Sequence, residues 1–205
     1  MTPTRHVGIY LFPDVEALDF AGPYEVFTTA SRVSQRLHPD LAAPFHVFSV
    51  AATAPGRGPV RARAGLRIAP DHALHEHPPI DVLVIPGGVV TAERDKPDVL
   101  RWVADCARSA ECVASVCTGA FILAQAGIVT QGPITTHWED QRDLAAAFPA
   151  LQVVDGPRWV EQGQVITSAG ISAGIDMSLY LVERLCGASL AQATARQMDY
   201  AWPHG

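Results

Sequence analysis

The feature that most constrains the fold is a pair of short, almost entirely apolar runs at 81–88 (DVLVIPGG) and 112–116 (CVASV). Continuous apolar runs are typical of parallel strands that are covered on both faces, whereas half-exposed strands alternate apolar and polar residues. Two further runs, rich in β-branched and aromatic residues, occur at 6–12 and 45–52. Helical patterns lie between and after these runs, at about 23–36, 97–109, 118–127 and 138–147 and from Ser172 onward. This alternation predicts an α/β fold with a mostly parallel sheet and helices on both faces.

Two segments predict pairs of antiparallel strands. The stretch 157–168 is typical of a hairpin that turns at Gln162-Gly163, and 58–70 indicates a second, more exposed pair. The sequence contains no repeat, linker or low-complexity tract. We therefore expect residues 1–205 to form a single domain.

Composition and charge limit the partners of the chain. With 205 residues and 48% hydrophobic content, it can bury a sizeable core. The net charge of −6 and the absence of a Lys/Arg cluster argue against nucleic acid as a partner. No apolar stretch reaches about 18 residues, so we expect no membrane-spanning segment. The first residues lack the pattern of a signal peptide, and we expect a cytoplasmic protein with free thiols.

Among the four cysteines, Cys117 occupies an unusual position. It follows the apolar run 112–116 and precedes the helical pattern TGAFILAQAG, so it lies where a strand turns sharply into a helix. Such a turn exposes a nucleophile above the sheet, and a helix N-terminus favours thiolate. We therefore expect a pKa below the usual value of about 8.5. The patterns around Cys106, Cys112 and Cys186 instead indicate small apolar core residues.

The glycines of IPGG at 85–88 end the first of the apolar runs. Gly87 and Gly88 could expose backbone N–H groups that, together with the N–H of Thr118, form an oxyanion-type pocket for substrate. A plain Pro-Gly-Gly turn is the alternative.

Two carboxylates, Glu16 and Asp19, follow the first predicted strand. Because the carboxyl ends of parallel strands share one edge of the sheet, these side chains are expected near Cys117. One of these carboxyl groups would then donate and accept protons beside the thiol. The alternatives are a turn or cap role for Asp19, ahead of a helix with Pro23 in its first turn, and a solvated charge for Glu16.

Histidines provide two further candidates. Thr136 and Glu139 fit a capping box, which places His137 in the first turn of a helix, where it could line the substrate site. A polar residue at a helix start is the alternative. The segment 71–79 contains His72, His75 and His77 at a spacing that could suggest zinc, but it is not anchored to a strand end, which favours a solvated loop. We expect no bound metal.

Several motifs together resemble the ThiJ/PfpI superfamily, the class I glutamine-amidotransferase-like proteins. They extend over almost the full chain and are FPDVEALDFAGP, DVLVIPGG, SVCTGAFILAQAG, TTHW, TSAGISAGID and TARQMDY. The resemblance implies a flavodoxin-like three-layer sandwich with the cysteine on a nucleophile elbow. It also implies that Cys117 is the family cysteine, Asp19 the acid of the L-D-x-x-G-P stretch and Gly88 the glycine of the IPGG turn. Within the superfamily, the chain is most similar to isonitrile hydratases and to the sensor domains of AraC-type regulators.

Departures from other branches narrow the expected chemistry. Peptidase-like members have histidine directly after the cysteine, where this chain has Thr118. The His-x-Glu pair of amidotransferases is missing from the last third of the sequence, and Ser115 replaces the first glycine of an esterase-type elbow. These three activities are therefore disfavoured.

The resemblance implies a lyase that adds water to an isonitrile and releases an N-substituted formamide through a covalent Cys117 intermediate. This chemistry needs a small-molecule substrate and no cofactor, and the sequence contains no nucleotide-binding glycine motif. The resemblance also implies a homodimer. Two alternatives stay open: a non-catalytic ligand- or redox-sensing domain, and a related cysteine hydrolase or glyoxalase-type enzyme. Against the sensor, we expect no DNA-binding module, since the sequence ends at Gly205.

Overall fold

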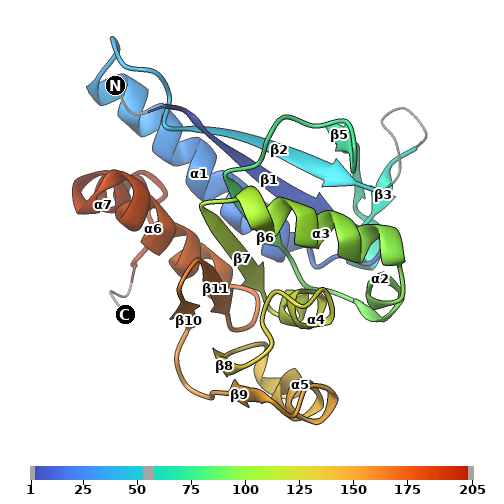
Figure 1. Ribbon diagram of the computed structural model, residues 1–205. Helices are drawn as coiled ribbons and strands as arrows, with labels where there is room; N and C mark the ends of the chain where they lie inside the picture. Colours follow the sequence, from blue (N-terminus) through green and yellow to red (C-terminus); the bar gives the residue numbers. More distant parts are fainter. Residues whose placement is uncertain (1–2, 53–57, 203–205) are drawn as a thin grey trace.

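A computed structural model describes residues 3–52 and 58–202. Its centre is a seven-stranded sheet in the order β10-β11-β7-β6-β1-β2-β5 (Figure 1). Every neighbouring pair is parallel except β10 with β11. In chain order, the strands are β1 (Arg5–Leu11), β2 (Phe45–Ala51), β5 (His72–Ala73), β6 (Val82–Ile85), β7 (Cys112–Val116), β10 (Trp159–Gln162) and β11 (Val165–Ser168).

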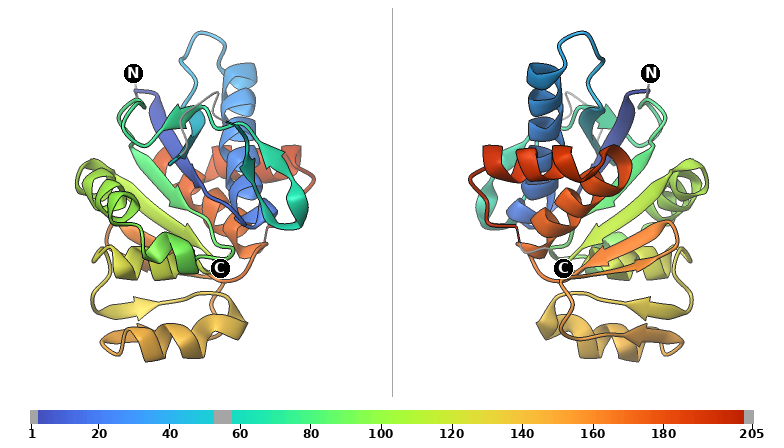
Figure 2. Two further views of the ribbon diagram at one scale, coloured as in Figure 1. Left: turned by 90° about the vertical axis from the view of Figure 1, so that its right-hand side faces the viewer. Right: turned by 90° about the vertical axis from the view of Figure 1, so that its left-hand side faces the viewer.

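Helices cover both faces of this sheet. Figure 2 shows one group, blue and red, on one side and the green helix α3 on the other. The first group contains α1 (Ala17–Leu37), α6 (Ala173–Cys186) and α7 (Ala188–Gln197), and the second contains α2 (Thr91–Arg94), α3 (Pro97–Ser109) and α4 (Gly119–Gln125).

Most of the core accordingly falls into two apolar clusters, one with Val26 and Leu179 and the other with Trp102 and Ile122, and a third, small cluster contains Leu11, Ala51 and Val60. All residues of β6 and β7 are buried, as the continuous apolar runs predict. The predicted three-layer α/β arrangement is confirmed. None of the helices in the described part of the chain is long and apolar enough to span a membrane.

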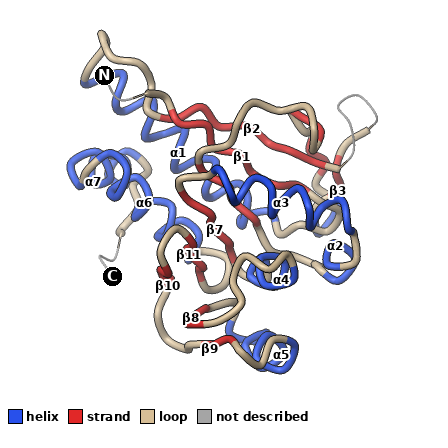
Figure 3. Tube along the Cα trace, in the orientation of Figure 1, coloured by secondary structure: helices blue, strands red, loops and turns tan. Residues whose placement is uncertain are grey.

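Smaller elements extend the sandwich. The parallel pair β8 (Gly132–Ile134) and β9 (Leu151–Val153) forms a separate small sheet next to α5 (Gln141–Ala147), which the short helix η2 (Trp138–Asp140) precedes, and β8 contacts the edge strand β10 of the main sheet (Figure 3). The antiparallel pair β3 (Val60–Arg61) and β4 (Arg67–Ile68) flanks η1 (Arg63–Gly65), and β10 and β11 form the hairpin predicted at 157–168.

Helix α1 differs from its prediction. It begins at Ala17, six residues before the predicted start at 23, and Pro23 lies inside it. Proline lacks a backbone N–H, so the carbonyl of Asp19 loses its usual helical partner, but the rest of the helix continues. The correction matters for the site because it places Asp19 in the first turn of α1.

Candidate active site

The backbone at Cys117 turns sharply between β7 and α4. Its φ is 55°, a left-handed value that is uncommon for residues other than glycine. The helix approaches β6 so closely that a Cβ on Gly119 would lie 2.1 Å from the carbonyl oxygen of Ile85. The Thr136 hydroxyl donates to the Cys117 carbonyl at 2.8 Å, and the Cys117 N–H donates to the carbonyl of Ser168 at 3.2 Å. The predicted sharp turn from strand to helix at Cys117 is confirmed.

Asp19 is fully buried and lies beside this elbow. Its Oδ2 accepts the N–H of Gly87 at 3.0 Å, and among the described residues its buried Oδ1 has no conventional hydrogen-bond partner. Glu16, and not Asp19, is the N-cap residue of α1. The Asp19 side chain accepts the N–H of Gly87, which lies in the turn after β6 and outside α1. The cap alternative for Asp19 is therefore wrong. The nearby Glu16 pairs with Arg63 at 3.2 Å and is not a freely solvated charge.

The surroundings of Asp19 favour its neutral form. Burial raises the pKa of its carboxyl from 3.8 to about 7, and the negative charge of Glu16 acts in the same direction. The N–H of Gly87 and the neighbouring Cys117 thiol lower this pKa, but by less. A carboxyl group with a pKa near neutrality can both release and take up a proton at pH 7.

The thiol of Cys117 does not behave as the sequence predicted. Only 7% of the residue is exposed, and burial, followed by the charge of Asp19, raises its pKa to about 12. Hydrogen bonds from the backbone N–H groups of Thr118 and Ile171 oppose this rise. The expectation of a lowered pKa is wrong because the loss of hydration outweighs the effect of the helix end. Reaction at neutral pH therefore needs a base for the thiol proton, and Asp19 is in place for that task.

The two predicted glycines hold the site together through their own N–H groups. Gly87 donates to Asp19, and Gly88 donates to Thr118 Oγ1 at 2.9 Å. A Cβ at Gly87 would lie 2.6 Å from the Thr118 nitrogen and 2.8 Å from Asp19 Oδ2, so only glycine fits there. Since both N–H groups already have acceptors in the chain, Thr118 N–H is the predicted donor that faces the sulfur. Substrate binding by the two glycines stays a prediction.

His137 lies at the edge of the site. It is itself the N-cap residue of η2, and its Nδ1 accepts the N–H of Glu139 at 3.3 Å. The predicted capping box is wrong because the Thr136 hydroxyl binds the Cys117 carbonyl instead. The imidazole packs against Gly170, where a Cβ would lie 2.1 Å from its Cδ2. This contact places His137 next to the loop that carries Ile171, and its role toward substrate stays a prediction.

Ile171 is the site residue that the sequence analysis missed. Its N–H faces the Cys117 sulfur, and its φ is 44°, a strained value for a β-branched residue. The segment TSAGISAGID that contains it was noted only as part of the family resemblance. A backbone donor cannot be recognised from residue type, and Gly170 before it was the only local signal of an unusual turn.

The remaining candidate residues are the histidines of segment 71–79 and the three other cysteines. His77 Nε2 accepts the indole N–H of Trp102 at 2.8 Å, and His72 lies in the edge strand β5 with its ring against Phe48. The prediction that 71–79 is entirely a solvated loop is therefore wrong. Within residues 3–52 and 58–202, no three His, Cys, Asp or Glu side chains lie close enough together to hold a metal ion. The three other cysteines pack in the apolar clusters.

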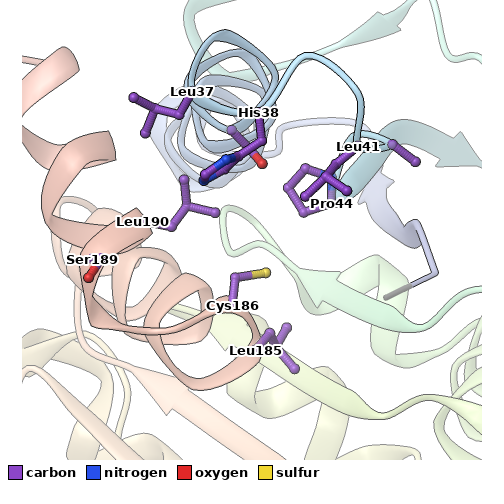
Figure 4. Close-up of a pocket in the computed structure, with 10 residues that line it drawn as sticks. Leu37, His38, Leu41, Pro44, Leu185, Cys186, Ser189 and Leu190 are labelled. Carbon is purple, nitrogen blue, oxygen red and sulfur yellow. The ribbon is translucent and has the colours of Figure 1, made fainter. Parts of the chain in front are cut away.

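An apolar pocket of about 310 Å³ lies at the other end of the sheet. Figure 4 shows Leu37 and Leu41 on one side of it and Cys186 and Leu190 on the other. Pro44, which also lines it, accepts the N–H of Arg5 at the first residue of β1. The pocket is therefore at the amino ends of the strands, whereas Cys117 follows the carboxyl end of β7.

Comparisons with known proteins identify the family and the fold. The model of the DJ-1/PfpI family matches residues 5–184. Isonitrile hydratase of Pseudomonas putida is 34% identical over 197 residues, which cover 95% of this chain and 78% of that protein. The HTH-type transcriptional regulator CdhR of Pseudomonas aeruginosa is 31% identical over 193 residues, covering 91% of this chain and 52% of the regulator, so the chain spans about half of its length.

Solved structures show the same fold. A ThiJ/PfpI family protein from Pseudomonas syringae superposes with a TM-score of 0.84 at 26% identity, covering 100% of this chain and 78% of the other. DJ-1beta of Drosophila melanogaster superposes with a TM-score of 0.80 at 21% identity, covering 98% and 100%. The predicted flavodoxin-like fold is confirmed, and the chain belongs to the DJ-1/PfpI family.

Proposed function

We propose that this protein is an isonitrile hydratase-like lyase that converts an isonitrile and water into an N-substituted formamide. The observation that carries the proposal is the buried carboxyl of Asp19 beside the Cys117 thiol, with a pKa of about 7. Addition of water to R–N≡C needs one nucleophile and one group that moves protons, and this pair supplies both. The similarity to isonitrile hydratase supports the same reaction.

In the first half of the reaction, Asp19 takes the thiol proton as the Cys117 sulfur attacks the terminal carbon of the isonitrile. Asp19 then returns this proton to the same carbon. The S–H bond is thereby replaced by S–C and C–H bonds, and the product is a thioimidate, Cys–S–CH=N–R. The N–H groups of Thr118 and Ile171 stabilise the negative charge that develops on the sulfur.

In the second half, Asp19 accepts a proton from water as the water oxygen attacks the thioimidate carbon. That proton is passed to the nitrogen of the substrate. The C–S bond then breaks, the remaining hydroxyl proton returns to sulfur, and R–NH–CHO is released. The chain thus ends each cycle with a neutral thiol and an ionised Asp19, as it began.

A ligand- or redox-sensing role is the second candidate. Similarity to the regulator CdhR supports it. The raised pKa of Cys117 fits a non-catalytic ligand sensor, because a thiol that keeps its proton is a weak nucleophile, and for the same reason it disfavours redox sensing. The two candidates differ in whether Asp19 activates that thiol.

The test is incubation of the protein with a simple alkyl isonitrile in H₂¹⁸O, with detection of the formamide by mass spectrometry. We expect formamide that carries ¹⁸O at its carbonyl, and no product from the variant Cys117→Ser above the background without protein. The variant Cys106→Ser is the matched control, since Cys106 packs in the core. Absence of product with the wild type across alkyl and aryl isonitriles would exclude the lyase and favour the sensor.

We also propose that the protein acts as a homodimer on a small-molecule substrate. Sedimentation equilibrium tests this, since a single chain has a mass of 21.9 kDa. A mass that stays at this value at micromolar concentration would contradict the dimer.

A further inference from the structure

An ion-pair cluster contacts the loop 169–172 and has no role in the mechanism proposed above. Its centre is Asp176, a fully buried carboxylate in the first turn of α6. The guanidinium group of Arg158 pairs with Oδ2 of Asp176, and the Tyr200 hydroxyl donates to Oδ1 at 2.9 Å. A buried carboxylate is stable only when its oxygens have partners of this kind, so the cluster fixes the position of the guanidinium group.

Arg158 holds the loop at both of its ends. Its carbonyl accepts the N–H of Ala169 at 2.9 Å, and its Nη2 donates to Ser172 Oγ at 3.2 Å. Ser172 is the N-cap residue of α6, but its side chain makes no capping bond and accepts from Arg158 instead. The strained backbone of Ile171 thus lies between two residues that are both tied to Arg158.

The loop 169–172 also makes two contacts with Cys117. The Cys117 N–H donates to the carbonyl of Ala169 at 3.2 Å, and the N–H of Ile171 faces the sulfur. The left-handed conformation of an isoleucine costs about 1–3 kcal/mol, so surrounding contacts must hold it. The bonds from Arg158 are the contacts in place to do so.

We infer that Arg158, fixed by Asp176 and Tyr200, is a positioning residue that holds loop 169–172 so that the N–H of Ile171 points at the Cys117 sulfur. Arginine suits this task because its planar group donates in two directions at once, whereas lysine is a point charge. The inference rests on the proposed function only where turnover is concerned. The effect of this N–H on the reactivity of the Cys117 thiol can be measured without isonitrile.

The experiment compares Arg158→Lys with Arg184→Lys. Arg184 is the matched control because it also joins the hairpin to α6, through Glu161 at 2.6 Å, and makes no contact with the loop. Each variant is alkylated with limiting iodoacetamide between pH 7 and 10, and the rate at Cys117 is obtained by peptide mass spectrometry. The charged groups that act on the sulfur, Asp19 from α1 and Asp140 from η2, are unchanged in both variants.

We expect Arg158→Lys to slow alkylation of Cys117 roughly tenfold at each pH, the effect of losing one hydrogen bond to a charged group. Turnover of isonitrile should fall by a similar factor in kcat with little change in KM, and Arg184→Lys should match the wild type. A loop that merely loosens would expose the buried sulfur and give faster alkylation. That result, or wild-type rates in Arg158→Lys, would overturn the inference.

Two milder variants test the same inference if the Arg158→Lys protein does not fold. Ser172→Ala removes only the bond from the Arg158 side chain to the loop, and Tyr200→Phe removes only the bond from Tyr200 to Asp176. Both should slow alkylation of Cys117, and Tyr180→Phe, which loses a bond to Glu161, should not. Unchanged rates in both milder variants would refute the positioning role. Failure of the wild type to turn over isonitriles would refute the proposed function and leave the alkylation result standing.

Discussion

Replacing Asp19 by asparagine removes the proton shuttle and keeps the shape of the side chain. The amide oxygen can still accept the N–H of Gly87, so the contact with the β6–α2 turn survives. If Asp19 moves protons, turnover of isonitrile should fall by about 10²–10⁴, the usual contribution of general acid–base catalysis. The thiol proton then loses the carboxylate that hydrogen-bonds with Cys117.

The same change should stabilise the protein at neutral and alkaline pH. The carboxyl pKa rises from 3.8 to about 7 on folding, and each unit of difference corresponds to about 1.4 kcal/mol. Above pH 4 the unfolded chain loses this proton while the folded chain keeps it, so the wild type loses stability as pH rises to about 7. An amide has no such loss, and its largest gain above pH 7 is about 4 kcal/mol.

Thermal melts at pH 4.5 and pH 8, run beside turnover assays, measure both effects. For a chain of this size, 1 kcal/mol corresponds to about 2–4 °C in melting temperature. We expect the melting temperature of Asp19→Asn, relative to wild type, to be several degrees higher at pH 8 than at pH 4.5. Glu16→Gln is the matched control, since Glu16 lies in the same segment and pairs with Arg63. It should keep near-wild-type turnover.

Two results would refute this reasoning. If Asp19→Asn turned over isonitrile at the wild-type rate while Glu16→Gln lost activity, the acid would be assigned to the wrong residue. If the difference in melting temperature between Asp19→Asn and wild type did not change with pH, Asp19 would titrate normally, and the raised pKa could not be part of the mechanism.

Three further predictions concern pH, the glycine turn and nucleic acid. In the wild type, kcat/KM should rise with pH through about 7, because the active form holds one proton on the Asp19–Cys117 pair; a rate that falls through this range would contradict the base role. Gly87→Ala should lose turnover by at least tenfold and lower the melting temperature, since its Cβ would meet Thr118 and Asp19, and activity assays with thermal melts check this. In gel-shift experiments at low salt, no sequence-dependent DNA binding is expected from a net charge of −6, and a retained specific complex would revive the regulator hypothesis.

The elements whose signals are local were predictable. The buried strands β6 and β7 and the hairpin β10–β11 follow from apolar runs and a Gln162-Gly163 turn, because a strand covered on both faces needs no polar residues. Strands β8 and β9, each three residues long, were missed because such short runs show no periodicity. The start of α1 was missed because Pro23 normally marks a helix boundary, and packing of the helix against the sheet overrode that preference.

The sequence by itself determined which residue is the candidate nucleophile, since Cys117 lies at a strand–helix junction that is visible in the chain. It limited the candidate partner to Glu16 and Asp19, between which the family motif favoured Asp19. Only the tertiary structure decided how these groups ionise, because a pKa depends on burial and on charges brought together from distant segments. It also decided which backbone N–H faces the sulfur. Ile171 contributes a main-chain group that every residue but proline has, so its role arises from the conformation of its loop and not from its side chain.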